Sequence, residues 1–139
     1  MRNSLPILLI DDDSMDAVLF KRATDNLKIT NPVVHLTTCR KGLDYLKDPK
    51  NKKPWIVITD LNTPQMDGIE FLRIIKSDKV LKRIPVVVLT TSKDRQDIIK
   101  TFKLNVAGYM VKAVDYKKFV EMIRTINLYW TQSELPNGG

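Results

Sequence analysis

The run from Ile56 to Gly68 constrains this chain more than any other stretch, because a strand, a loop and a helix follow one another within it. Its first residues are apolar and β-branched, which is typical of a strand buried on both faces. The run stops at Asp60, and Asp67 then caps an amphipathic segment. Ligands of open α/β sheets bind beyond the carboxyl ends of strands. We therefore expect the chemistry of this chain at Asp60, unless that residue only starts a turn.

Apolar runs alternate with amphipathic segments along all 139 residues. Strands are predicted at residues 5–10, 33–36, 55–59, 85–90 and 107–111, and helices at 15–27, 40–46, 68–77, 94–104 and 116–130. Strict alternation with continuous apolar strands indicates an α/β fold, a five-stranded parallel sheet with helices on both faces. We expect one domain over residues 1–132 and a polar, flexible tail over 133–139.

The spacing of apolar residues also predicts which helical faces are buried. The first helix is expected to follow an N-cap at Ser14 and to bury Ala17, Val18, Phe20, Ala23 and Leu27. The later faces are predicted as Leu43 and Leu46; Ile69, Leu72 and Ile75; Ile98, Ile99 and Phe102; and Phe119, Val120, Ile123, Ile126 and either Tyr129 or Trp130.

The composition, 43% hydrophobic and 28% charged, is typical of a soluble globular protein. The single cysteine, Cys39, excludes an internal disulfide and fits a reducing compartment. The apolar run near Met1 is too short for a signal peptide, and no stretch approaches membrane length. We therefore expect a cytoplasmic protein without a membrane partner.

The net charge of +7 raises the question of nucleic-acid binding. Its densest part, residues 47–54, contains two prolines and no aromatic residue, so it indicates a solvated loop. We expect no direct contact with nucleic acid. The only histidine, His35, is expected to be a packed strand residue, and without a second histidine no zinc site is expected.

Polar residues follow four of the predicted strands. Asp11 and Asp12 follow the first, Asp60 the third, Thr90 ends the fourth, and Lys112 follows the fifth. Carboxylates brought together repel one another unless a cation joins them, and Mg²⁺ prefers such oxygen ligands. A lysine and a hydroxyl beside them suit phosphoryl transfer onto an aspartate. Each residue alone has an ordinary explanation as a cap, a helix-end charge or a solvated side chain, but the combination favours a site.

With these residues, the chain resembles the receiver domain of two-component response regulators, the CheY-like family with a flavodoxin-like (βα)5 fold. The resemblance extends from about residue 5 to residue 130. Its matching segments are residues 7–13, 60–68, 86–92 and 108–112. The second segment, with Asp-x-Asn-x-Pro followed by Met-Asp-Gly, is the most specific.

The resemblance implies a role for each position. Asp60 is expected to be the phosphoacceptor, with Asp11, Asp12, Asp60 and the backbone carbonyl of Asn62 around Mg²⁺. Thr90 and Tyr109 are expected to act as the switch pair, and Lys112 to contact the phosphoryl group. A sensor histidine kinase would donate that group. The result is a single-domain response regulator that signals by protein contact through its fourth helix, fifth strand and fifth helix, and that turns over no external substrate apart from slow self-dephosphorylation.

Two positions depart from the family pattern. Ala113 stands where proline usually follows the lysine with a cis peptide bond. A non-proline cis bond costs about 3–4 kcal/mol. We therefore predict either a trans bond with a displaced Lys112 or a strained cis bond. Thr63 stands where methionine is frequent, and we expect little effect from it.

The end of the last helix, residues 128–130, together with residues 134–136 is similar to the single-domain regulators associated with bacterial phytochromes. This implies a phytochrome-type kinase as partner and a homodimer formed through the last helix. The apolar pair Tyr129 and Trp130 suits such an interface, or it packs on its own domain; the sequence leaves both open.

Two other functions use related features. Haloacid-dehalogenase-type phosphatases also have a strand-end aspartate and Mg²⁺. They need a second acid where this chain has Asn62, and they have threonine or valine where this chain has Pro64. A binding module that works without phosphorylation usually lacks an acidic or phosphoacceptor residue, and here both are present. The sequence therefore favours the phosphorylated receiver.

Overall fold

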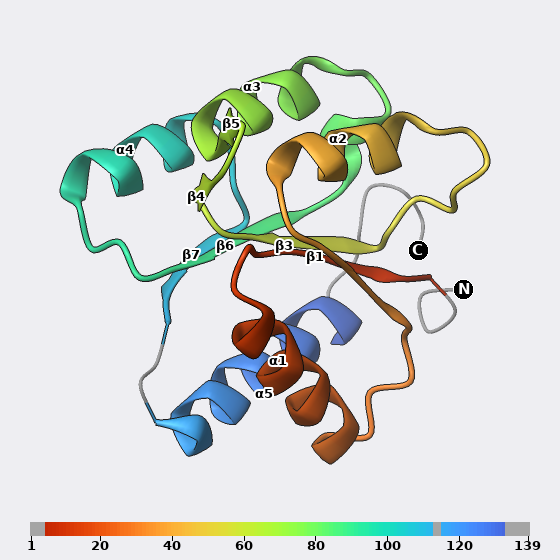
Figure 1. Cartoon of the computed structure of the whole chain (residues 1–139), viewed down its shortest axis with the longest axis vertical. Helices are drawn as coiled ribbons and strands as arrows, with labels where there is room; N and C mark the ends of the chain where they lie inside the picture. Colours follow the sequence, from red (N-terminus) through yellow and green to blue (C-terminus); the bar gives the residue numbers. More distant parts are fainter. Residues whose placement is uncertain (1–4, 113–114, 133–139) are drawn as a thin grey trace.

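The central sheet of the computed structural model, which describes residues 5–112 and 115–132, consists of five parallel strands. They are β1 (Ile7–Ile10), β2 (Val33–Leu36), β3 (Ile56–Thr59), β6 (Val86–Thr90) and β7 (Gly108–Val111). Their order across the sheet is β2-β1-β3-β6-β7, with β1 and β3 next to each other (Figure 1). The predicted five-stranded parallel sheet is confirmed.

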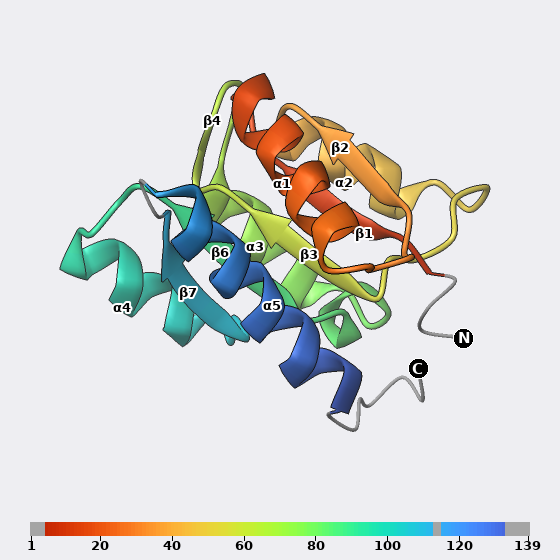
Figure 2. The ribbon, with the colours of Figure 1, turned by 90° about the horizontal axis from the view of Figure 1, so that it is seen from below.

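Five α-helices cover the sheet in two layers. They are α1 (Ser14–Asn26), α2 (Cys39–Lys47), α3 (Gly68–Ser77), α4 (Arg95–Lys103) and α5 (Tyr116–Gln132). Figures 1 and 2 show α1 and α5 side by side on one face, and α2, α3 and α4 on the other. None of the helices in the described ranges is both long enough and apolar enough to cross a membrane.

Alternate residues of the strands build two separate cores, because side chains along a strand point to opposite faces. Leu8, Ile10, Val57, Val86 and Val88 pack with α2 and α3. The residues between them in the chain pack with α1 and α5, namely Ile7, Leu9, Ile56, Ile58, Val87 and Leu89. This two-sided burial explains why the strands are apolar throughout.

The start of α1 differs from the prediction. Its N-cap is Asp13, whose carboxylate accepts a hydrogen bond of 2.9 Å from the Met15 N–H, so Ser14 is already helical. Ala17 and Phe20 are buried as predicted, but Val18 is 53% exposed. Successive helical residues are about 100° apart, so a helix that turns Ala17 to the sheet leaves its neighbour outside.

Helix α4 also differs from the prediction, since its apolar residues are not buried. Thr101 is its one buried residue, whereas Phe102 is 50% and Ile99 is 37% exposed. The reason is its place beside β7, the last strand of the sheet, where little of the domain remains to cover it (Figure 1). The predicted faces on α2 and α3 are confirmed, as is that on α5 up to Ile126; the side chains of Tyr129 and Trp130 lie outside the described residues.

The segment after Asp60 is more ordered than the predicted loop. It forms a small antiparallel hairpin of β4 (Asn62–Thr63) and β5 (Met66–Asp67), with Gln65 at a φ of 74° in its turn. A 3-10 helix at Leu81–Arg83 is a further element that was not predicted. The predicted tail at residues 133–139 lies outside the described residues.

The hairpin passes close to the start of α3 at Gly68, where there is no room for a side chain. A Cβ on Gly68 would lie 2.6 Å from the Cα of Leu61 and 2.7 Å from its carbonyl oxygen. These are backbone atoms, which cannot rotate out of the way as a side chain could. We expect Gly68→Ala to lower the free energy of unfolding by about 1–3 kcal/mol, because overpacking forces the backbone to shift.

Urea denaturation measures this change, with Gly108→Ala as the matched control. A Cβ on Gly108 would meet its nearest neighbours, side-chain atoms of Val87, at 3.9 Å. Equal unfolding midpoints for the two variants would contradict the prediction.

Candidate functional site

The register of the parallel strands brings the polar strand ends together. Ile10 pairs with Thr59 across β1 and β3, so Asp11 and Asp60 follow at the same edge of the sheet. Thr90 pairs with Val111 across β6 and β7, so Lys112 follows there too. Backbone hydrogen bonds continue one residue beyond the strands, with the Asp60 N–H bonded to the Ile10 carbonyl at 2.9 Å. The acidic residues and the lysine therefore start from rigid positions.

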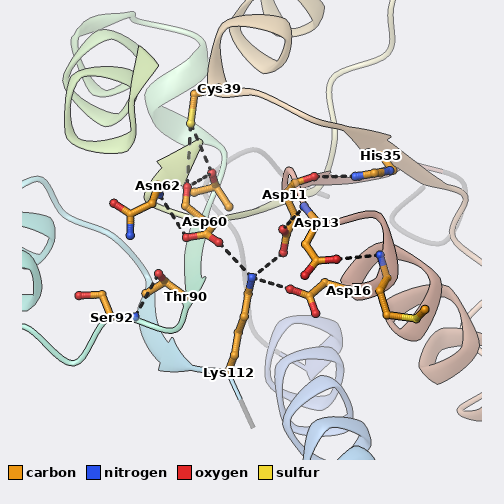
Figure 3. A network of polar contacts seen from close by, with 12 residues as sticks. Asp11, Asp13, Asp16, His35, Cys39, Asp60, Asn62, Thr90, Ser92 and Lys112 are labelled. Carbon is orange, nitrogen blue, oxygen red and sulfur yellow. Dashed lines mark hydrogen bonds and ion pairs between the residues drawn. The ribbon is translucent and has the colours of Figure 1, made fainter. Parts of the chain in front are cut away.

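Lys112 lies at the centre of this edge and contacts three carboxylates (Figure 3). Its Nζ is 2.8 Å from Asp11 Oδ2, 3.0 Å from Asp60 Oδ2 and 2.7 Å from Asp16 Oδ2. Its side chain is only 12% exposed. The structure thus joins the predicted Asp11, Asp60 and Lys112 and adds one residue that the sequence analysis missed, Asp16.

Burial and pairing oppose each other at this cluster. Burial by itself would lower the pKa of Lys112, but hydrogen bonds from its ammonium group to Asp11, Asp16 and Asp60 outweigh burial and hold the pKa above its ordinary value. Burial raises the pKa of Asp11, although Lys112 and the Asp13 N–H partly offset that effect. The lysine is therefore a fixed positive charge, and the carboxylates depend on cations around them.

Three of the carboxylates form a pocket suited to a divalent cation. Asp11, Asp12 and Asp60 each place one oxygen so that all three lie within 4.8 Å of one another. Asp11 and Asp60 are buried and Asp12 is exposed, so the pocket opens to solvent on one side. Carboxylate oxygens are the ligands that hard divalent cations prefer, and one lysine does not balance the surrounding carboxylates. These residues therefore fit a divalent metal ion.

Backbone contacts hold the two buried aspartates in place. The single histidine, His35, donates from Nε2 to the carbonyl oxygen of Asp11 at 2.8 Å. The Thr59 hydroxyl donates to the carbonyl of Asp60 at 2.8 Å, and the Asn62 N–H donates to Asp60 Oδ1 at 3.2 Å. His35 is a half-buried strand residue, as predicted, but its bond to Asp11 was missed because it depends on the pairing of β1 with β2.

The two predicted switch residues meet at a shared neighbour, Ser92. Thr90 is fully buried, and its Oγ1 accepts a 3.3 Å hydrogen bond from the Ser92 N–H. The Tyr109 hydroxyl donates to the Ser92 carbonyl at 2.9 Å. The Ser92 hydroxyl in turn donates to Asp97 of α4 at 2.7 Å. A continuous chain of contacts therefore joins Thr90 to Tyr109 and to α4.

The two departures from the family pattern have different outcomes. Ala113 and the isomer of its peptide bond lie outside the described residues, but Lys112 itself reaches the carboxylates. Thr63 has a structural contact, because its hydroxyl accepts a 3.0 Å hydrogen bond from the Cys39 N–H at the start of α2. That bond ties the hairpin beside Asp60 to the neighbouring helix.

Comparisons with known proteins agree with this geometry. Residues 7–124 match the family model described as the response regulator receiver domain. The probable methanogenesis regulatory protein FilR2 of Methanothrix harundinacea is 36% identical, with 94% of this chain and 88% of the relative covered. Response regulator Rcp1 of Synechocystis is 32% identical, with 91% and 89% covered.

Solved structures give the same result. The phosphorylated cyanobacterial phytochrome response regulator RcpA superposes with a TM-score of 0.89 at 33% identity, covering 96% of this chain and 99% of that one. The Mn²⁺-bound form of Rcp1 has a TM-score of 0.87 at 32% identity, covering 95% and 99%.

The contacts of Lys112 predict how stability depends on charge and pH. We expect Lys112→Met to lower the free energy of unfolding by about 2–4 kcal/mol at neutral pH in EDTA, because the carboxylates lose their counterion. The folded pKa lies above the ordinary 10.5, so the lysine's contribution is complete below 10.5 and is lost as the pH rises through the folded value.

Chemical denaturation in buffers below and above pH 10.5 measures how much the free energy of unfolding differs between wild type and Lys112→Met. The exposed Lys117 of α5 supplies the control substitution, Lys117→Met. A constant difference at every pH, or an equal loss in the control, would show that the ion pairs do not stabilise the fold.

Proposed function

The chain belongs to the response regulator receiver domain family of two-component systems, and from this premise we propose that Asp60 accepts a phosphoryl group from a sensor histidine kinase. The proposal is supported by one observation: the Asp60 carboxylate contacts Lys112 Nζ at 3.0 Å and is itself part of the acidic pocket with Asp11 and Asp12. A nucleophile, a fixed positive charge and a divalent-metal pocket thus lie at one edge of the sheet. That combination suits phosphoryl transfer, where catalysis consists mostly of positioning and charge neutralisation.

The transfer follows from this arrangement. An oxygen of Asp60 attacks the phosphorus of the donor phosphohistidine, a P–O bond forms, the P–N bond breaks, and the imidazole leaves with a proton from water. Lys112 neutralises charge on the transferred group as a point charge. The Thr90 hydroxyl donates to another phosphoryl oxygen once it has left Ser92.

We propose Mg²⁺ as the metal of the pocket, held by Asp11, Asp12, Asp60 and the backbone carbonyl of Asn62. The acidic pocket supports a divalent cation, and the relative Rcp1 has been crystallised with Mn²⁺. Mg²⁺ is commonly held by one or two carboxylates together with phosphate oxygens and water. When bound, the ion neutralises charge on the phosphoryl oxygens.

Phosphorylation would be read through the contacts of Ser92. Movement of the Thr90 hydroxyl toward the phosphoryl group releases the Ser92 N–H, and Tyr109 holds the carbonyl of the same residue. The change passes to α4 and β7 and to the protein surface beside them. The exposed Ile99 and Phe102 of α4 give that surface an apolar contact for a partner.

The alternatives have less support. A phosphatase that acts on external substrates needs a second acid where Asn62 stands, and the side-chain amide of Asn62 cannot act as that acid. We therefore propose a phosphoacceptor with slow self-dephosphorylation that turns over no external substrate. A module that works without phosphorylation would not need Lys112 and the acidic pocket together.

We propose a cytoplasmic protein whose kinase is of the phytochrome type and which forms a homodimer through the end of α5. The kinase assignment is supported by the likeness to RcpA, which is a phytochrome response regulator. The dimer is supported by the apolar pair Tyr129 and Trp130, whose side chains lie outside the described residues. We propose no direct contact with nucleic acid or membrane.

The test of the phosphoacceptor is intact mass after incubation with acetyl phosphate, with and without Mg²⁺. We expect one phosphoryl group per chain with Mg²⁺, and none in EDTA or in Asp60→Asn, because the amide is not a nucleophile. Asp67→Asn is the matched control, since the Asp67 carboxylate caps α3 and asparagine caps equally well.

A wild-type chain that takes up no phosphoryl group from the donor and Mg²⁺ would contradict the proposal. The Ala113→Pro variant then identifies the reason. Phosphorylation in that variant alone would assign the failure to Ala113, and its absence there as well would favour the module that works without phosphorylation.

Sedimentation velocity tests the dimer. We expect wild type to sediment as a dimer at micromolar concentration and Tyr129→Ala/Trp130→Ala as a monomer, because apolar residues at an interface centre carry much of its affinity. Lys118→Ala, an exposed residue of the same helix, is the control. A monomeric wild type would show that the pair packs on its own domain.

A further inference from the structure

Asp16 is the carboxylate nearest to Lys112, and nothing in the proposed chemistry uses it. Its Oδ2 is 2.7 Å from Lys112 Nζ, compared with 2.8 Å for Asp11 and 3.0 Å for Asp60. It comes from the first turn of α1 and not from a strand end, and its side chain is 30% exposed. Figure 3 shows it on the opposite side of the lysine from Asp60.

The three partners of Lys112 have different tasks during phosphorylation. Asp11 and Asp60 belong to the acidic pocket, where a divalent cation would share their charge. Asp60 also forms the bond to phosphorus under the proposed function. Asp16 is not a member of that pocket. Among the carboxylates bonded to Lys112, Asp16 is therefore the one that binds neither the metal nor the phosphoryl group and keeps its contact with the lysine.

Lys112 needs such a partner because its side chain is long and flexible. A lysine ammonium lies at the end of a flexible four-carbon chain, and hydrogen bonds are needed to hold it in one place. Ala113 follows it in the sequence, so no proline ring restrains the next backbone angle. By contrast, α1 is firmly seated, with Phe20 and Ala23 almost fully buried against the sheet and α5. A carboxylate on α1 is thus a rigid anchor.

We propose that Asp16 is a positioning residue that holds the Lys112 ammonium at the phosphorylation site throughout the transfer. The proposal rests on the proposed function, since it concerns the same lysine. Without Asp16, the ammonium has no carboxylate of its own to hold it when the metal and the phosphoryl group engage Asp11 and Asp60. It would then spend less time where charge develops on the phosphoryl oxygens, and the transfer would slow.

The test measures the rate of phosphorylation of Asp16→Asn by acetyl phosphate at saturating Mg²⁺, followed by intact mass. We expect a fall of about tenfold, since small misplacements of a charged group are costly in catalysis. Asp13→Asn is the matched control. It removes the same charge from the same end of α1, and asparagine keeps the cap on the Met15 N–H. We expect the control to stay within about twofold of wild type.

A double-mutant cycle shows whether Asp16 acts through Lys112. In a Lys112→Met background, Asp16→Asn should change the rate by less than about twofold, because the group that it positions is gone. An equal fall in both backgrounds would overturn the proposal, since Asp16 would then act independently of the lysine. A faster Asp16→Asn would also overturn it, by showing that Asp16 competes with the phosphoryl group for Lys112.

Binding of Mg²⁺ without any phosphodonor gives a separate readout by titration calorimetry. We expect Asp16→Asn and Asp13→Asn to have similar affinities, because neither residue belongs to the pocket. A loss of affinity confined to Asp16→Asn would make Asp16 a metal ligand and overturn the positioning role. A wild type that is never phosphorylated would contradict the proposed function, and the inference with it. A phosphorylated wild type matched by Asp16→Asn would overturn the inference alone.

Discussion

The ion cluster of Lys112 with Asp11, Asp16 and Asp60 is the interaction on which the rest of the site depends. Carboxylates at one edge of a parallel sheet repel one another, and two of these are buried. A single ammonium group, within 3.0 Å of all three carboxylates, reduces this repulsion. One positive charge does not neutralise three negative charges. The remaining negative charge favours a divalent cation. The charges of that cation and of Lys112 together would offset the negative charge of an incoming phosphoryl group under the proposed function. Stability and reactivity therefore come from the same contacts.

The sheet supplies the rigidity that this cluster requires. Its central strands are buried on both faces by two independent cores, so the strand ends have little freedom to move. The hydrogen bonds that continue beyond β1, β3 and β7 fix the backbone of Asp11, Asp60 and Lys112. Thr59 and His35 then hold the carbonyl groups of the two buried aspartates. The carboxylate that we propose as the phosphoacceptor thus follows directly after a strand that is buried on both faces.

The side that we propose as the readout surface is built differently from the site, because fewer of its residues are buried. Beside the edge strand β7, α4 buries little of its surface and leaves Phe102 half exposed. Ser92 connects this looser region to the site, because its backbone bonds to both Thr90 and Tyr109 and its hydroxyl bonds to Asp97 of α4. Elements with few buried contacts open at low cost, which fits our proposal that a small change at Thr90 alters this face.

The sequence by itself determined the alternation of strands and helices, the parallel sheet, and the convergence of Asp11, Asp60, Thr90 and Lys112. Apolar periodicity and strand-end position are local properties that the chain order carries. Only the tertiary structure decided the rest: the exposure of Val18 and Phe102, the hairpin after Asp60, and the contacts of Asp16 and His35. Those features depend on how one element is rotated and seated against another. No local pattern specifies that geometry, because it results from packing the whole domain at once.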